Sequence, residues 1–121
     1  MIMSDRVQWL EHKGTRILYV DYSGTSEQEF IQIVDKFESE LLKQTPGSVV
    51  TLTNVTNTVI TNELRARLKE MAERTRGRSR KAAAIGITGF KRAIAVLLRK
   101  DLFYAKSLEE AKDWLVEEAQ E

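Results

Sequence analysis

Strand-like segments alternate with segments of helical periodicity along most of this chain, and this order constrains the fold more than any other feature. The first two segments, residues 7–12 and 15–22, are both strand-like, and Lys13-Gly14 between them is typical of a tight hairpin turn. From the second strand onward, a helix-like segment follows each strand, which favours parallel strands joined by right-handed crossovers. The sequence therefore predicts an α/β fold with a mixed, mostly parallel sheet.

Capping residues predict where the first and last helices begin. Ser26 and Glu29 have the spacing of a capping box, and so do Ser107 and Glu110 near the C-terminus. The only Pro, Pro46, lies in a turn after the first helix. Each of these two helices should therefore begin directly after its serine.

The remaining elements follow from apolar periodicity. In a helix that begins at Thr61 or Asn62 and ends near Gly77, one apolar stripe should be buried, formed by Leu64, Leu68 and Met71. The expected strands cover residues 7–12, 15–22, 49–54, 82–87 and 102–105. With a further helix from residue 90, we expect a single domain, residues 1–121, of five strands covered by four helices.

The composition favours binding over catalysis. The chain has no Cys and one His, so cysteine nucleophiles and thiolate metal sites are excluded and no pair of His can share a metal. We therefore expect no enzyme activity, no catalytic residue, no metal and no cofactor. No segment has the apolar length of a signal peptide or of a membrane span, so the expected location is the cytoplasm.

Polar side chains collect where the expected parallel strands end. Ligands of open α/β sheets bind outside the carboxyl ends of the strands, so this edge is the candidate site. The candidate residues for a ligand or partner there are Asn54, Thr56, Thr61, Thr88 and Lys91. The alternative is that the hydroxyl and amide groups only satisfy the backbone of the loops.

One turn at this edge has the character of an anion site. Two glycines, Gly86 and Gly89, precede a helix that carries Lys91 and Arg92 in its first turn. The turn lacks the spacing of a nucleotide-binding loop and of a dinucleotide fingerprint. A strand-like segment precedes it, which also argues against a KH domain.

Charge is distributed unevenly although the net charge is only +1. Residues 65–100 hold 12 basic and 2 acidic residues, whereas residues 1–64 hold 5 and 9, and residues 101–121 hold 2 and 7. The basic segment is expected to be a solvated helix face or to dock on an acidic protein partner, and a match to the acidic final helix is a third alternative. Nucleic acid is not expected as a partner, because no aromatic residues lie between these cations for base stacking.

Four segments carry a resemblance to a known family: Ile17-Leu18-Tyr19-Val20-Asp21-Tyr22-Ser23-Gly24, Val50-Thr51-Leu52-Thr53-Asn54-Val55-Thr56, Ala84-Ile85-Gly86-Ile87-Thr88-Gly89-Phe90-Lys91 and Ser107-Leu108-Glu109-Glu110-Ala111 with Trp114-Leu115. They resemble bacterial STAS-like proteins, named for the sulfate transporter and anti-sigma factor antagonist domain. This group is similar to stage II sporulation protein AA and, more distantly, to CRAL-TRIO lipid-binding domains.

The resemblance implies a non-enzymatic module of the bacterial cytoplasm that regulates through protein–protein interaction. The alternative is a binder or carrier of a small apolar or anionic ligand, such as a lipid. A further alternative is that the partner is a second copy of this chain, in a homodimer.

The resemblance further points to Thr61. In anti-sigma antagonists, a serine that follows an Asp is phosphorylated at the start of the helix after the third strand. Ile60-Thr61-Asn62 occupies that place here without the Asp-Ser pair, so Thr61 is the candidate phosphoacceptor. Its alternative role is that of an N-cap.

Overall fold

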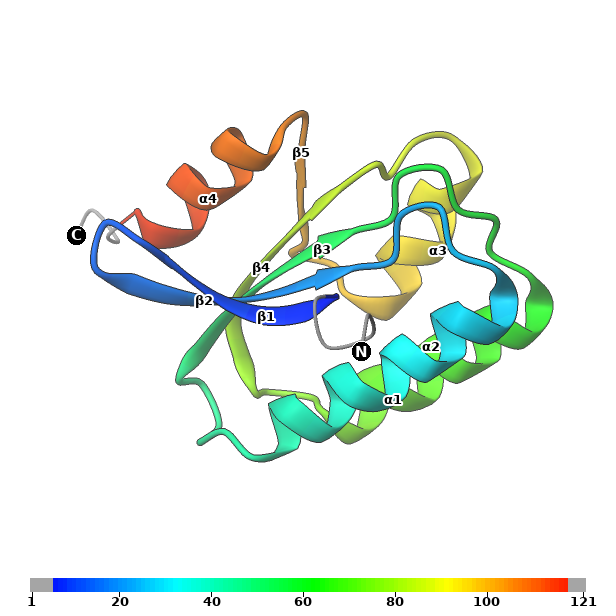
Figure 1. Cartoon of the computed structure of the whole chain (residues 1–121), viewed down its shortest axis with the longest axis horizontal. Coiled ribbons are helices and arrows are strands. Elements are labelled where there is room, and N and C mark those ends of the chain that lie inside the picture. The colour runs from blue at the N-terminus through cyan, green and yellow to red at the C-terminus, as the bar shows by residue number, and fades with distance from the viewer. Residues whose placement is uncertain (1–5, 118–121) are drawn as a thin grey trace.

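Five strands form one sheet in the order β1-β2-β3-β4-β5 in the computed structural model, which describes residues 6–117 (Figure 1). The hairpin strands β1 and β2 are antiparallel, and every other neighbouring pair is parallel. The strands are β1 (Val7–His12), β2 (Thr15–Asp21), β3 (Val49–Asn54), β4 (Ser79–Ile85) and β5 (Phe103–Ala105). The predicted α/β class and mixed, mostly parallel sheet are confirmed.

Within the described part of the chain, four helices cover the sheet, three on one face and one on the other (Figure 1). They are α1 (Glu27–Leu42), α2 (Asn62–Arg74), α3 (Phe90–Leu98) and α4 (Leu108–Val116). The parallel strands follow chain order across the sheet, so right-handed crossovers place all the connecting helices on the same face. Figure 1 shows α1 and α2 side by side below the sheet, with α4 on the opposite side.

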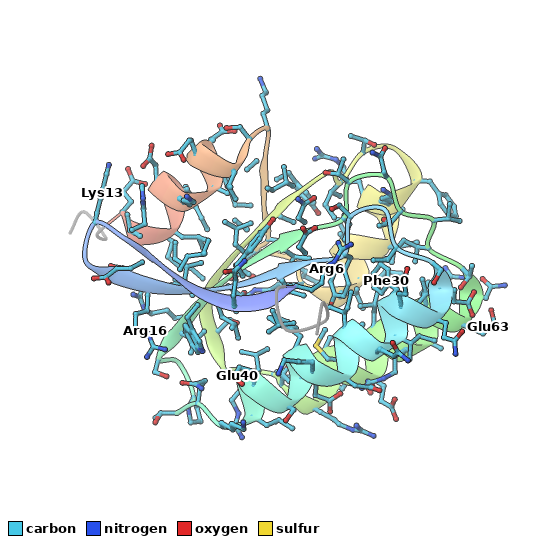
Figure 2. The ribbon with its side chains drawn as sticks, in the orientation of Figure 1. Arg6, Lys13, Arg16, Phe30, Glu40 and Glu63 are labelled. Atoms are coloured by element: carbon cyan, nitrogen blue, oxygen red, sulfur yellow. The ribbon has the colours of Figure 1, made fainter. Side chains whose placement is uncertain are left out.

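Each face of the sheet has its own apolar core. Leu18 and Val20 of β2 pack against α1, and Phe30 projects from that helix towards the sheet (Figure 2). The residues between them in sequence point the other way because side chains alternate along a strand. Thus Ile17 of β2 joins the second core, which α4 closes with Leu115.

The helix caps confirm the two predicted helix starts, but one of the two predicted capping boxes forms only in part. Ser26 and Glu29 form a complete capping box, in which the Ser26 N–H donates to the Glu29 carboxylate at 2.9 Å. Ser107 also accepts from the Glu110 N–H, at 3.1 Å. However, the Glu110 carboxylate accepts from the N–H of Lys106, one residue before the cap, so the second box is only half formed.

Strand β4 differs from its prediction at both ends. It begins at Ser79, three residues earlier than expected, because Ser79 pairs with Val49 in the neighbouring strand. It ends at Ile85 because Gly86, with φ of +84°, turns the chain away from the sheet. Helix α2 is also shorter than expected and ends at Arg74 rather than near Gly77.

Part of the basic segment is used inside the fold. The guanidinium of Arg67 on α2 binds Glu38 at 2.6 Å and Asp35 at 2.8 Å, both on α1. Lys81 of β4 donates to the Trp114 carbonyl on α4 and lies over the ring of that residue. Arg67 therefore forms its ion pairs with acidic residues of α1. The final helix, α4, instead binds Lys81 through a main-chain carbonyl and an aromatic ring.

Candidate ligand-binding cavity

A cavity of about 390 Å³ lies between the sheet and helices α2 and α3. Its floor contains Thr51 and Thr53 of β3 and Ala82 and Ala84 of β4. The register pairs Thr51 with Ala82 and Thr53 with Ala84, so these four small side chains form a continuous surface. Protein interiors are normally filled to close packing, and small side chains at these positions leave the space above them open.

Apolar side chains form most of the cavity wall. Helix α2 contributes Leu68 and Met71, and helix α3 contributes Ile94, Ala95 and Leu98. The stripe predicted to be buried on α2 is therefore only partly in the core. Leu64 is fully buried, whereas Leu68 and Met71 are half-buried, because they pack against the core on one side and line the cavity on the other.

Lys91 is a cation in this largely apolar wall. Its ammonium donates to the Val55 carbonyl at 2.8 Å, and no carboxylate pairs with it among residues 6–117. Partial burial lowers the pKa of Lys91, because desolvation disfavours the charged form. The wall also contains Asp101, which is neutralised by Arg99 at 2.6 Å.

Tyr22 is a cavity-lining residue that sequence analysis did not select. Its ring stacks on Phe30 with the centroids 4.0 Å apart, and its side chain is almost fully buried. The hydroxyl has no hydrogen-bond partner within the described part of the chain. Burial raises the pKa of this hydroxyl, so it is a neutral donor. The available signal was a tyrosine at the carboxyl end of a strand.

The strand-end edge that the sequence predicted does form. Loops after β2, β3 and β4 lie together at one end of the sheet (Figure 1). The Tyr22 N–H donates to the Asn54 carbonyl at 2.8 Å, and the Gly24 N–H donates to the Thr56 carbonyl at 3.2 Å. Main-chain hydrogen bonds thus connect the loop after β2 to the loop after β3.

Of the five candidate residues, only Lys91 lines the cavity. Asn54 donates to the Tyr19 hydroxyl at 3.2 Å and accepts from the Thr56 N–H at 3.0 Å. Thr88 is exposed, and its carbonyl accepts from the Lys91 N–H in the first turn of α3. The contacts of Asn54 are those of a loop-stabilising side chain, which was the alternative interpretation of this edge.

Thr61 is the N-cap of α2. Its hydroxyl oxygen accepts from the Leu64 N–H at 3.1 Å. Arg65, the nearest cation in sequence, is engaged with Asn62 at 3.1 Å. These are the contacts of a helix cap, and phosphorylation of Thr61 stays a prediction.

The capping role of Thr61 has a measurable consequence. We expect Thr61→Ala to lower the free energy of unfolding by about 1 kcal/mol, because the cap acceptor is lost. Thr61→Asp should stay within about 0.5 kcal/mol of the original protein, because Asp caps well and favours the helix dipole. Urea denaturation of both variants measures the difference. Equal stabilities would show that the cap contributes nothing.

The fold is that of a SpoIIAA-like α/β domain, and its apolar cavity is partly open to solvent. The crystal structure of an uncharacterized protein from the DUF3478 family with a SpoIIAA-like fold, from Shewanella loihica PV-4, superposes with a TM-score of 0.65. The two sequences are 13% identical, and the match covers 90% of this chain and 91% of that one. The predicted resemblance in fold is thereby confirmed.

The sequence itself has no further match. No protein-family model matches it, and no curated protein is similar to it. Within residues 6–117, no helix has both the length and the apolar character needed to cross a membrane.

Proposed function

We propose that this protein binds a small, largely apolar ligand in the cavity between the sheet and helices α2 and α3, without catalysing a reaction. The observation that supports this function is the cavity itself, about 390 Å³ in volume with mostly apolar walls. Pockets for small ligands range from about 300 to 1,000 Å³ and combine apolar walls with a few polar groups. Lys91 is a polar group of this kind.

The construction of the cavity supports a binding role over incomplete packing. Helix α3 lines the cavity with Ile94 and Ala95, and α2 lines it with Leu68 and Met71. Leu side chains in place of Ala82 and Ala84 would fill this volume without introducing a polar group. Small residues on the floor therefore keep an apolar space open beneath two helices, as a ligand site requires.

Regulation through a protein partner, the other hypothesis from the sequence, stays a proposal. Its test is a complex with a purified partner and the variant Thr61→Asp. A complex that is unchanged by this variant would remove Thr61 from the interaction.

Blocking the cavity should abolish ligand binding. Ala95 on α3 is buried and lines the cavity, so Ala95→Phe places a ring in the ligand volume. We expect the affinity for a neutral apolar fluorophore, N-phenyl-1-naphthylamine, to fall about tenfold or more, equivalent to about 1.4 kcal/mol or more. Titration followed by fluorescence gives the dissociation constants.

The matched control is Ala93→Phe. Ala93 lies on the same helix but is exposed and does not line the cavity, so this variant should bind the fluorophore as the original protein does. Native mass spectrometry of freshly purified protein should also detect a co-purifying ligand. A clean ligand-free mass, together with no fluorophore binding, would contradict the proposed function.

A further inference from the structure

We propose that the ligand is an amphiphile with one acidic head group, bound by Lys91 at the end of the cavity beside the carboxyl end of β3. This inference rests on the proposed function and specifies the ligand class. It follows from the charge of the cavity wall and from the contacts and position of Lys91.

The cavity wall carries an excess of positive charge. Its ionisable residues comprise three cations, Lys91, Arg76 and Arg99, and one carboxylate, Asp101. Asp101 is bound by Arg99 at 2.6 Å, so its negative charge does not compensate Lys91 or Arg76. Arg76 is exposed, whereas Lys91 is partly buried. An anionic ligand group is therefore favoured, and Lys91 is the cation positioned to meet it inside the cavity.

The Lys91 ammonium has unused binding capacity. An ammonium group has three N–H donors, and among the described residues the only acceptor recorded for Lys91 is the Val55 carbonyl, at 2.8 Å. A partly desolvated cation without an anionic partner is electrostatically unfavourable. A carboxylate in the cavity would accept from the remaining donors and restore the stability of the charged form.

Lys91 lies at one end of the cavity. Its ammonium binds the carbonyl of Val55, the residue after β3, at 2.8 Å. From there the floor continues along Ala84 and Ala82 with apolar walls, which suits a hydrocarbon tail.

A comparison of two probes with the same tail tests this inference. Dodecanoic acid and dodecan-1-ol are titrated against N-phenyl-1-naphthylamine bound to the delipidated full chain, at about pH 8, where a carboxylic acid is ionised. We expect the acid to bind about tenfold more tightly than the alcohol. Lys91→Met should remove this preference and leave the affinity for the alcohol within about twofold.

A control variant tests whether the cavity or the surface charge selects the acid. Arg92→Met is the charge-matched control. Arg92 lies next to Lys91 on α3 but over the Tyr104 ring, outside the cavity wall, so the acid preference should persist. Lys91→Gln, which keeps a donor for Val55, replaces Lys91→Met if that variant unfolds.

The outcomes distinguish this inference from the proposed function. Equal affinity for acid and alcohol in the original protein would overturn the head-group assignment and leave apolar ligand binding in place. Loss of preference in Arg92→Met as well as Lys91→Met would show that general surface charge, not the cavity, selects the acid. If no apolar probe binds at all, both the proposed function and this inference fail.

Discussion

Replacing Gly86 by Ala lowers the free energy of unfolding by about 3 kcal/mol or more, the largest effect that we expect from a single methyl group in this chain. Gly86 has φ of +84°, which costs an L-residue about 1–2 kcal/mol. A Cβ atom there would also lie 2.6 Å from the Thr56 nitrogen and 2.8 Å from its Cα. Relief of such overpacking typically costs a further 1–3 kcal/mol or so. Urea denaturation followed by circular dichroism measures the sum.

The control separates backbone strain from the clash. Gly24 also has a positive φ, +67°, but a Cβ atom at Gly24 would meet nothing within 4 Å. Gly24→Ala should therefore cost about 1–2 kcal/mol, the strain alone. Adding Thr56→Ala to Gly86→Ala should rescue little, because the clash involves main-chain atoms of Thr56 as well as its hydroxyl. Similar losses at Gly24 and Gly86 would contradict the close approach of the two loops.

Arg67→Met is expected to destabilise the protein by about 2–3 kcal/mol. Glu38 is nearly fully buried, and its two oxygens bind Arg67 at 2.6 Å and Arg74 at 2.8 Å. Removing one partner of a buried ion pair leaves a charge uncompensated, which costs about 3–5 kcal/mol when no other partner remains. The effect is smaller here because Arg74 still binds Glu38. Thermal and urea denaturation both measure the loss.

Two companion variants test the cause. Arg65→Met removes an exposed arginine from the same helix and should change stability by less than about 0.5 kcal/mol. Arg67→Met combined with Glu38→Leu should recover most of the loss, because replacing both members of a buried pair by apolar groups is often neutral. If the double variant is as unstable as the single one, burial of the Glu38 charge does not explain the loss.

The same cluster gives stability a dependence on pH. Burial alone would raise the pKa of Glu38, but hydrogen bonds from Arg74 and Arg67 outweigh it and hold the pKa below its ordinary value of 4.5. A carboxyl with a lowered folded pKa contributes stability that is fully present above the unfolded pKa and is lost as the pH falls through the folded one. In Arg67→Met the pKa of Glu38 rises, so the loss of stability below about pH 4.5 should be less steep.

These ion pairs also bear on the cavity. Arg67 joins α2 to α1, and Leu68, the next residue, is part of the cavity wall. The position of α2 relative to the sheet sets the height of the cavity above Thr51 and Thr53. A loss of the Arg67 contacts should therefore weaken the binding of an apolar ligand as well as the fold.

Most of the fold was predictable because its signals are local. Ser26 and Glu29 are three residues apart and cap α1 by contacts within one turn. The strand Val49–Asn54 was predicted with correct ends because its β-branched residues are bounded by a turn and a loop. The start of β4 was missed because Ser79 to Lys81 is a polar sequence, and only pairing with β3 makes it a strand.

The candidate site was predictable only in part. Lys91 was selected because it opens a helix after a strand, and it does line the cavity. Tyr22 was not selected, because nothing in its neighbours predicts that its hydroxyl is buried without a partner. Leu68 and Met71 have the periodicity of core residues, and sequence periodicity does not distinguish a packed face from the wall of a cavity.

By itself, the sequence determined the α/β class and the parallel connections, because periodicity and helix capping depend on residues that are close in sequence. It also determined that the chain has no Cys, since this is a matter of composition. Only the tertiary structure decided the strand order, the placing of three helices on one face and the cavity beneath α2 and α3. These depend on which distant side chains face one another. Ala82 and Ala84 lie opposite Thr51 and Thr53 because of the sheet register, and that register leaves the space unfilled.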